Sequence, residues 1–505
     1  MQFFVPLSWA NQAAVGFRNA LVNPARRERT VLIALGVYVV LWTIYGTIAK
    51  GSQGLHYDMT EVIAWSRDLS LGYLKHPPLA GWIVWLWFSV FPLAEWSYYL
   101  LAMLMPATAL WFAWRLSADY LDIEKRVMGL ALLTLVPFYN FHALKFNVNT
   151  VLMPVWAATT FWFLQSYKTR SALYALLAGV GAAACMLGKY WSVFLLAGLV
   201  IAALIDSRRT KYFRSPAPWI TVAAGAVLLA PHVVWLMHNN FMPFTYAMTV
   251  HGARPLLAVL KGIAGYFVGS AGYVAIPLVA VWLAAWPSRV TVADMMWPAE
   301  KERRLAAAAF WAPFLLPVIG ALGSFTEITS LWSMPAWTLL PVLLLSPPAV
   351  RLTAADTRRA LIGAVVVPLI MLILAPVIAI QVQRSGPAPA AAHAQLLASQ
   401  IETAWHEATS QPLRFVGGDA EIAYDVIAAA ADKPRALPDM LPPTDTELSQ
   451  AGMALVCFSE DLPCVHATRA RGPNGRRIES DIVRNYLGIP GKPQHYSIVI
   501  VAPKP

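Results

Sequence analysis

The sequence predicts an all-α polytopic membrane protein that carries a C-terminal α/β domain. Of its 505 residues, 58% are hydrophobic and only 13% are charged, which is unusual for soluble domains. Apolar runs recur near the roughly 20 residues that a helix needs to cross a bilayer, and a helix satisfies its own backbone hydrogen bonds in lipid. Short apolar runs bounded by turn residues near the C-terminus predict strands. We therefore expect a helical bundle followed by a small mixed domain.

The apolar runs predict about 11–13 transmembrane helices. The long apolar stretch 172–205 is interrupted by Lys189, which predicts a hairpin of two helices at this point. The start of the chain lacks the short apolar core and small-residue cleavage site of a secretory signal, so we expect the first apolar segment to be retained. We place spans at residues 31–49, 97–115, 127–144, 150–167, 172–187, 190–205, 218–237, 269–286, 305–322, 331–349 and 361–381.

Basic residues set the expected orientation, because short loops rich in Lys and Arg stay in the cytoplasm. All such loops share one side only if the segment 79–94 does not cross the membrane. That segment is short and rich in Trp, which is typical of an interfacial helix. The net charge of +11 then reports topology and requires no nucleic acid partner. The clusters are Arg26, Arg27 and Arg29; Lys125 and Arg126; Lys168 and Arg170; Arg208, Arg209, Lys211 and Arg214; Lys301, Arg303 and Arg304; and Arg351, Arg358 and Arg359.

The expected domains follow from this topology. Residues 1–30 form a cytoplasmic segment, 31–381 the transmembrane domain with 50–96 as its first outer loop, and 382–505 an outer soluble domain. In the last, RSGPAPAAAHA reads as a linker, AQLLASQIETAWHEA as an amphipathic helix, and LRFVGG, MALVCFS and YSIVIVA as strands. Cys457 and Cys464 would lie in an oxidising compartment, where a disulfide and two free thiols both remain open. Cys185, inside a span, is expected to be a small apolar residue.

Polar residues gather on the predicted outer face. The first outer loop, HYDMTEVIAWSRDLSLGYLKHPPLAGW, combines acids and bases between two apolar segments. The turns HALKFNVNT, LGKYW and GSFTEITS and the loop MHNNFMPFTYAMTVHGARP reach the same face, whereas the inward face holds mostly plain basic loops. This one-sided distribution predicts an active site at the outer membrane surface.

The order of these motifs resembles bacterial members of the protein mannosyltransferase and aminoarabinose transferase superfamily. The resemblance covers roughly residues 30–350 and is carried by the first outer loop, then NVNTVLMPVW, LGKYWSVFLLAGL, PHVVWLMHNNFMPFTYA and SLWSMPAWTLLP. It implies glycosyltransferases of the GT-C fold, which use a sugar attached to a polyprenyl phosphate and transfer it on the non-cytoplasmic side. In place of the Asp before a Pro that many relatives have, this chain has Lys145 with Asn147 and Asn149, which leaves the role of that turn open.

Such a transfer needs a base near the attacking hydroxyl and positive charge near the departing phosphate. Asp58 matches the acidic residue of the first outer loop in the resembling family and is the predicted base. Glu61, three residues on, would share its face of a helix and support it. Both carboxylates also fit the simpler roles of a solvated loop charge or a helix cap.

Positive and polar groups complete the predicted site. Lys75 and His76 precede a Pro pair that stiffens the loop, and both are assigned to the donor phosphate. His76 also fits a metal ligand or a loop anchor. An isolated cation at membrane depth usually faces a cavity or partner, so Lys189 is predicted to bind phosphate, with snorkelling as the alternative. Lys145 is assigned to the same phosphate. Asn149, Tyr190, His238 and Glu327 are assigned to substrate. No metal or other cofactor is required. A divalent metal remains an alternative, with His232, His238 and His251, together with Glu61 or Glu327, as its candidate ligands beside His76.

The predicted protein is therefore a glycosyltransferase of the bacterial inner membrane with a periplasmic active site. Its expected partners are a polyprenyl-phosphate sugar donor, the lipid bilayer and an envelope glycolipid acceptor. The acceptor is lipid A, another lipopolysaccharide sugar, or a different envelope lipid or glycan. A protein O-mannosyltransferase is the alternative enzyme. A lipid or sugar transporter is the alternative of another class, although transporters more often show internal repeats; an envelope assembly protein would not need the Asp58 loop.

Overall fold

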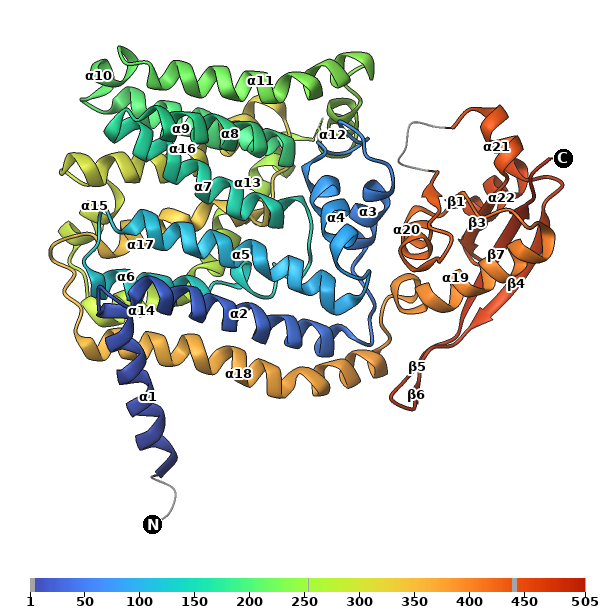
Figure 1. Cartoon of the computed structure of the whole chain (residues 1–505), viewed down its shortest axis with the longest axis horizontal. Helices are drawn as coiled ribbons and strands as arrows, with labels where there is room; N and C mark the ends of the chain where they lie inside the picture. The colour runs from blue at the N-terminus through green and yellow to red at the C-terminus, as the bar shows by residue number, and fades with distance from the viewer. Residues whose placement is uncertain (1–4, 253, 438–442, 505) are drawn as a thin grey trace. The chain divides into compact units, whose positions relative to one another are not determined.

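The computed structural model describes residues 5–252, 254–437 and 443–504, and the chain divides into two compact units (Figure 1). The first unit comprises Met1–Thr43, Lys75–Pro77 and Leu100–Leu372. The second comprises Ile44–Leu74, Pro78–Tyr99 and Ile373–Pro505. The first outer loop is thus divided between the two units.

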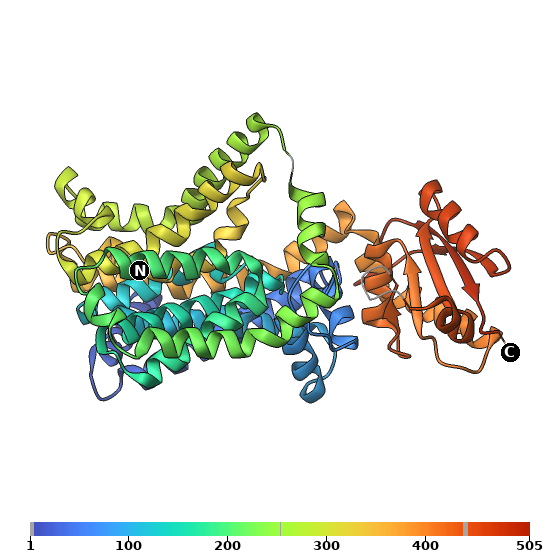
Figure 2. The same ribbon diagram turned by 90° about the horizontal axis from the view of Figure 1, so that it is seen from above.

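The first unit is helical, and its long helices run side by side (Figures 1 and 2). Helix α8 packs against α7 and α11, and α9 packs against α16. The helices in the first half of the chain, apart from α3 and α4, are α1 (Val5–Val22), α2 (Arg27–Lys50), α5 (Glu95–Ser117), α6 (Ile123–Thr134), α7 (Val148–Thr169), α8 (Ala172–Gly188), α9 (Val193–Ile205), α10 (Arg209–Phe213) and α11 (Ala217–His238). They are followed by α12 (Met242–His251), α13 (Leu256–Tyr273), α14 (Ala275–Ala285), α15 (Arg289–Met296), α16 (Lys301–Ser324), α17 (Leu340–Leu345) and α18 (Ala354–Ser385).

Six helices in the described part of the chain are long and apolar enough to cross a membrane: α2, α5, α11, α13, α16 and α18. Shorter apolar helices accompany them, among them α8 and the segment Tyr190–Ile205. The break between these two falls at Lys189, so the predicted hairpin is present. The chain is a multi-pass membrane protein, as its composition indicates.

Three predicted spans differ from the helices in the structure, and prolines account for the differences. Instead of one span at 269–286, α13 ends at Tyr273 and α14 follows, because the ring of Pro277 opposes the carbonyl four residues earlier. The predicted span 331–349 is a 3₁₀ helix, Ser330–Leu339, with Pro335 inside it, followed by the short α17. The predicted span 127–144 ends at Thr134 and continues as the 3₁₀ turn Pro137–Tyr139. These helix interruptions cannot be predicted from apolar composition alone.

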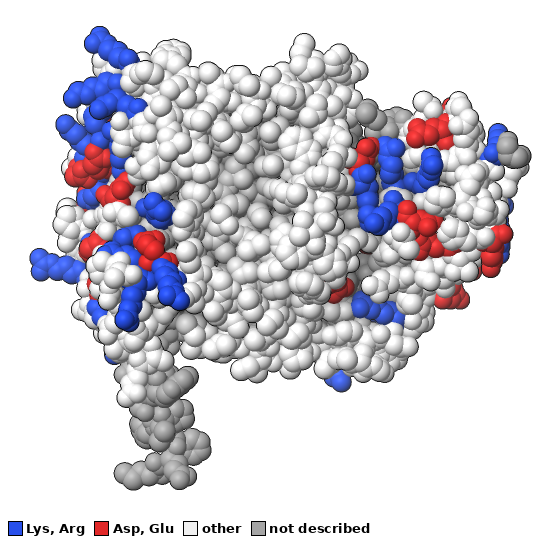
Figure 3. Space-filling view, in the orientation of Figure 1, with Lys and Arg blue, Asp and Glu red and all other residues white. Residues whose placement is uncertain are grey.

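Charged side chains gather at one end of the helical unit. The Lys168 ammonium lies 3.1 Å from a carboxylate oxygen of Asp119 and 3.9 Å from one of Glu302, and Glu302 also pairs with Arg208. The ends of α5, α7 and α9 therefore meet the start of α16. Figure 3 shows blue and red side chains together at this end, near α10 and α15, and an uncharged surface along the helices. This supports the prediction that the basic loops share one side.

The stretch between α2 and α5 folds into two short helices, α3 (Tyr57–Arg67) and α4 (Leu79–Val90). Helix α4 has 12 residues, which at 1.5 Å per residue is about 18 Å, shorter than the roughly 30 Å hydrocarbon core. Its length supports the prediction that the Trp-rich segment does not cross the membrane.

The C-terminal part of the second unit is built on a five-stranded sheet in the order β2-β1-β3-β7-β4. Strands β1 and β2 and strands β1 and β3 pair in parallel, and β7 is antiparallel to β3 and β4. The strands are β1 (Phe415–Gly418), β2 (Arg435–Ala436), β3 (Met453–Phe458), β4 (Arg476–Ile482) and β7 (Gln494–Val501), with a separate pair β5 (Asn485–Tyr486) and β6 (Ile489–Pro490). The helices are α19 (Pro389–Ala408), α20 (Ala420–Ala429), α21 (Asp445–Ala451) and α22 (Leu462–Arg471).

Alternating side chains of this sheet enter two apolar clusters. Val416 joins a core with Trp405 of α19 and Ile422 of α20, whereas Phe415 joins a smaller cluster with Val499. The predicted helix and the three predicted strands are present. The predicted linker is wrong in extent, because α18 continues to Ser385 and α19 begins at Pro389, where proline suits a first helical turn.

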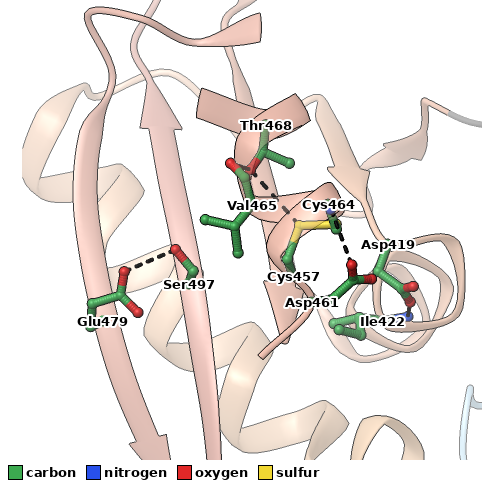
Figure 4. Close-up of a disulfide and its surroundings, with 9 residues drawn as sticks. All are labelled: Asp419, Ile422, Cys457, Asp461, Cys464, Val465, Thr468, Glu479 and Ser497. Atoms are coloured by element: carbon green, nitrogen blue, oxygen red, sulfur yellow. Dashed lines mark hydrogen bonds between the residues drawn. A yellow bond between two sulfur atoms is a disulfide. The ribbon is translucent and has the colours of Figure 1, made fainter. Parts of the chain in front are cut away.

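Cys457, on β3, and Cys464, on α22, form a disulfide (Figure 4). Asp461 caps α22 by accepting a hydrogen bond from the Cys464 backbone N–H at 3.1 Å. The structure therefore selects the bridge from the two states left open by the sequence. Cys185 is a buried free cysteine.

Removing this bridge with the double variant Cys457→Ala/Cys464→Ala is expected to lower the free energy of unfolding of the C-terminal domain by about 2–3 kcal/mol, because the bridge closes a short loop that the unfolded chain would otherwise leave open. Hydrogen exchange of β3 and β7, followed by mass spectrometry, measures the loss. An equal exchange rate in the variant and the oxidised wild type would contradict the expectation.

Candidate active site

Asp58 and Glu61 lie on the first turns of α3, in the second unit. His56 caps the helix, and its Nδ1 accepts a hydrogen bond from the Asp58 backbone N–H at 3.1 Å. Asp58 is partly buried, in the first turn, where the helix dipole favours a negative charge. Glu61 is 7% exposed, and the Tyr57 hydroxyl donates to its Oε1 at 3.4 Å. The two carboxylates thus have the helical spacing expected from the sequence.

The C-terminal domain holds α3 in place within the second unit. The Tyr57 ring lies 5.6 Å from the ring of Tyr424 on α20, and Ala64 belongs to the main core of the domain. At the end of α3, Asp68 forms an ion pair with Arg435 at 2.5 Å. A domain that begins more than 300 residues later therefore fixes the helix that carries the predicted base, which no local sequence pattern indicates.

Lys189 lies in the first unit, in the turn between α8 and α9. Its Nζ donates to Oδ1 of Asn149, near the start of α7, at 2.9 Å, and lies 4.9 Å from the centre of the Trp332 ring. These contacts hold the ammonium among three segments of the bundle. The structure thus brings together two of the residues predicted for the site and adds Trp332, which the sequence reasoning missed.

His76 lies among positive charges in the same unit. Burial, together with the charges of Lys189, Lys75 and His251, lowers the pKa of its imidazole to about 3. His76 is therefore neutral at physiological pH, so that it offers a hydrogen bond and no charge. Lys75 lies 5.8 Å from the centre of the Tyr246 ring. We refer to Lys75, His76, Lys189 and His251 as the basic cluster.

Three further residues reach this region: His251 at the end of α12, Arg254 in the loop after it, and Glu327 in the segment after α16. The backbone N–H of Glu327 donates to the His251 carbonyl at 3.3 Å, and Arg254 Nε lies 3.9 Å from a carboxylate oxygen of Glu327. Burial lowers the pKa of His251, as do the charges of Lys189 and Arg254. Arg254 was missed, although an isolated Arg in a predicted outer loop is a signal that could have singled it out.

Other predicted residues lie apart from these contacts or have structural partners. Tyr190 and His232 share a hydrogen bond of 3.0 Å. His238 is exposed at the end of α11. Lys145 lies near His142, and burial and the charge of Lys145 both lower the pKa of His142. Within residues 5–252, 254–437 and 443–504, no group of three or more His, Cys, Asp and Glu side chains is placed to hold a metal ion.

Comparison with known proteins places this arrangement in a known fold. Residues 75–235 match the family described as dolichyl-phosphate-mannose-protein mannosyltransferase. Two crystal structures of ArnT from Cupriavidus metallidurans, apo and bound to undecaprenyl phosphate, match with TM-scores of 0.57 and 0.58 at 14% identity. In each case 93% of this chain and 97% of the other are covered. The chain has the GT-C fold. This confirms the resemblance to the protein mannosyltransferase and aminoarabinose transferase superfamily.

One curated relative extends the comparison. The lipopolysaccharide core galacturonosyltransferase RgtB of Rhizobium johnstonii is 28% identical over 338 residues, which are 63% of this chain. The match spans 65% of the length of RgtB. The GT-C fold therefore extends over most of the chain, and the detailed sequence similarity over about two thirds of it.

Proposed function

We propose that this GT-C protein transfers a sugar from a polyprenyl-phosphate donor to a lipopolysaccharide or lipid A acceptor. The basic cluster carries the proposal. Two lysines surround a neutral histidine, and Asn149 orients one of the ammonium groups. Such a group favours an anion that accepts several hydrogen bonds, and a lipid phosphate at the membrane surface has this chemistry.

In the proposed reaction the acceptor hydroxyl attacks the anomeric carbon of the donor sugar. A bond forms between the acceptor oxygen and that carbon, and the bond from the carbon to the phosphate oxygen breaks. The carboxylate of Asp58 takes the hydroxyl proton, with Glu61 as its supporting carboxylate. Lys75 and Lys189 neutralise the charge that develops on the polyprenyl phosphate as it leaves, while neutral His76 donates a hydrogen bond.

Both substrate classes are supported by the comparisons. ArnT from Cupriavidus metallidurans has been crystallised with undecaprenyl phosphate, a ligand of the kind proposed here as the leaving group. RgtB acts on the lipopolysaccharide core, which favours a glycan acceptor on a lipid. We place the reaction on the periplasmic face of the bacterial inner membrane, with residues 31–381 as the catalytic domain and 382–505 as a periplasmic domain, because the basic loops that mark a cytoplasmic side lie at one end of the helices.

The proposal is tested with the purified protein in liposomes, undecaprenyl-phosphate donors that carry different sugars, and two acceptors. Isolated lipopolysaccharide is one acceptor and a Ser- and Thr-rich peptide is the other. We expect sugar to be transferred to the lipopolysaccharide, detected by mass spectrometry. Transfer to the peptide alone would support the protein mannosyltransferase that the match over residues 75–235 suggests, and no transfer with any donor would overturn the proposal.

The variant Lys189→Gln is expected to raise the KM for the donor about 10–100-fold, because the uncharged amide loses a charge-assisted hydrogen bond to phosphate. Steady-state kinetics with varied donor measures the effect. Lys168→Gln is the matched control, since Lys168 belongs to the charged end near Asp119 and Glu302. An unchanged donor KM in Lys189→Gln would exclude Lys189 from phosphate binding.

A further inference from the structure

A cavity of about 490 Å³ lies within the second unit, where α19 and α20 meet the segments on either side of α3 and α4. Its volume falls in the range of small-molecule sites, about 300–1,000 Å³. None of the residues assigned to the proposed transfer lines it. Its wall is mostly alanine, leucine and glycine, and its polar side chains are Thr60, Glu95, Gln395, Asp425, Arg484 and Asn485.

Asp425 is the most unusual residue of this wall. It is 1% exposed, and among the described residues neither of its carboxyl oxygens has a hydrogen-bond partner of normal geometry. The Thr60 hydroxyl lies nearby, but its hydrogen is donated to the Tyr57 carbonyl at 3.0 Å. A buried carboxyl without donors is costly. Both oxygens are closed to solvent, so a ligand that donates to them must first widen the space beside Asp425.

The cavity is bounded by fixed backbone and small side chains. Arg484 donates to the carbonyls of Gly51 and Ser52 at 2.6 and 3.0 Å, which ties the chain after α2 to the C-terminal domain. Gly54 has a φ of +74°, and a Cβ there would lie 2.3 Å from the Ala391 carbonyl oxygen. Alanines on α19 and α20 leave the space open. Most of the cavity is thus formed before a ligand arrives, and only the space beside Asp425 must widen.

The chemistry of the wall selects among ligand classes. The carboxyl groups of Asp425 and Glu95 would repel an inorganic or lipid phosphate. The six polar side chains of the wall make it unsuitable for the acyl chain of a lipid. No group of three or more His, Cys, Asp and Glu in the described ranges is placed for a metal ion. A sugar ring has hydroxyl donors for the carboxyls, oxygen acceptors for Arg484 and Gln395, and C–H faces for Ala and Leu.

We propose that this cavity binds a saccharide, as a neutral or amino sugar of one or two rings. The proposal that the bound saccharide is the glycan of the acceptor rests on the proposed function. The proposal that the cavity binds a saccharide does not. Burial, together with the charges of Glu421 and Asp419, raises the pKa of Asp425 to about 7. At neutral pH the carboxyl therefore exists in both forms, either of which accepts a sugar hydroxyl.

The test measures binding to the full-length protein in nanodiscs, without donor lipid, by saturation-transfer NMR. The probes are methyl mannoside, glucosamine and methyl galacturonide, which are neutral, cationic and anionic. We expect mannoside or glucosamine to bind more tightly than galacturonide. Asp425→Asn, which replaces an acceptor by a donor, and Ala428→Phe, which fills the cavity, should each weaken that binding by about tenfold or more.

Asp445→Asn is the control, because Asp445 is exposed on α21 and does not line the cavity. The proposal is overturned if neither mannoside nor glucosamine binds, if galacturonide binds most tightly, or if both cavity variants bind as the wild type does. Transfer activity is assayed separately. Sugar binding without transfer would refute only the proposed function, and cavity variants that raise the acceptor KM while the donor KM is unchanged would assign the site to the acceptor glycan.

Discussion

The Asp58→Asn variant is expected to transfer sugar about 10²–10⁴-fold more slowly than the wild type, the usual contribution of a general base. The amide has nearly the same shape and still fits the first turn of α3, where His56 accepts the backbone hydrogen bond. It cannot accept the proton of the attacking hydroxyl. The loss should therefore appear in kcat, measured at saturating donor and acceptor, with the affinity for the donor lipid unchanged.

Two further variants make this result specific. Glu61→Gln tests the supporting carboxylate and should reduce kcat less, because Glu61 is buried and bonded to Tyr57. Asp119→Asn removes a carboxylate at the charged end of the bundle, beside Lys168, and should leave transfer unchanged. If Asp58→Asn retains full kcat while Glu61→Gln loses it, the two roles are reversed; if both retain it, neither carboxylate is the base.

Much of the fold follows from patterns that act over short distances. The interruption of an apolar run at Lys189 predicted the turn between α8 and α9. Short apolar runs bounded by turn residues predicted β3 and β7, which pair with each other in the sheet. The missed interruptions lie at prolines inside apolar stretches, such as Pro277 and Pro335, where hydropathy stays high although the backbone hydrogen bonds change.

The sequence predicted which residues belong to the candidate site, but it did not predict which of them contact one another. Lys189 meets Asn149 across 40 residues of chain, and Trp332 approaches from a third segment. Neither pairing leaves a local pattern, because each depends on how separate helices pack. The clearest case is α3, whose partners Tyr424 and Arg435 lie in the C-terminal domain. A domain that the sequence presents as separate thus supports the helix of the predicted base.

The ionisation of Asp425 makes the stability of the C-terminal domain depend on pH. Its pKa rises from an ordinary 3.8 to about 7 in the folded domain, chiefly through burial. Between those values the unfolded chain has released its proton while the folded chain still holds it. The free energy of unfolding therefore falls as the pH rises from about 4 to 7, and the penalty stays constant above that range.

The Asp425→Asn variant is accordingly expected to stabilise the C-terminal domain by up to about 4 kcal/mol at pH 8 and to change its stability little at pH 4. The amide is neutral at both pH values, so it avoids the cost of a buried charge. Hydrogen exchange of β1 and β3 at the two pH values measures the effect, with exposed Asp445→Asn as the matched control. Equal stability of wild type and variant at pH 8 would show that the carboxylate is solvated. If the Asp425→Asn domain is more stable but binds sugar less tightly, the native carboxyl lowers the stability of the domain and is retained for ligand binding. Such a trade-off is common at functional sites.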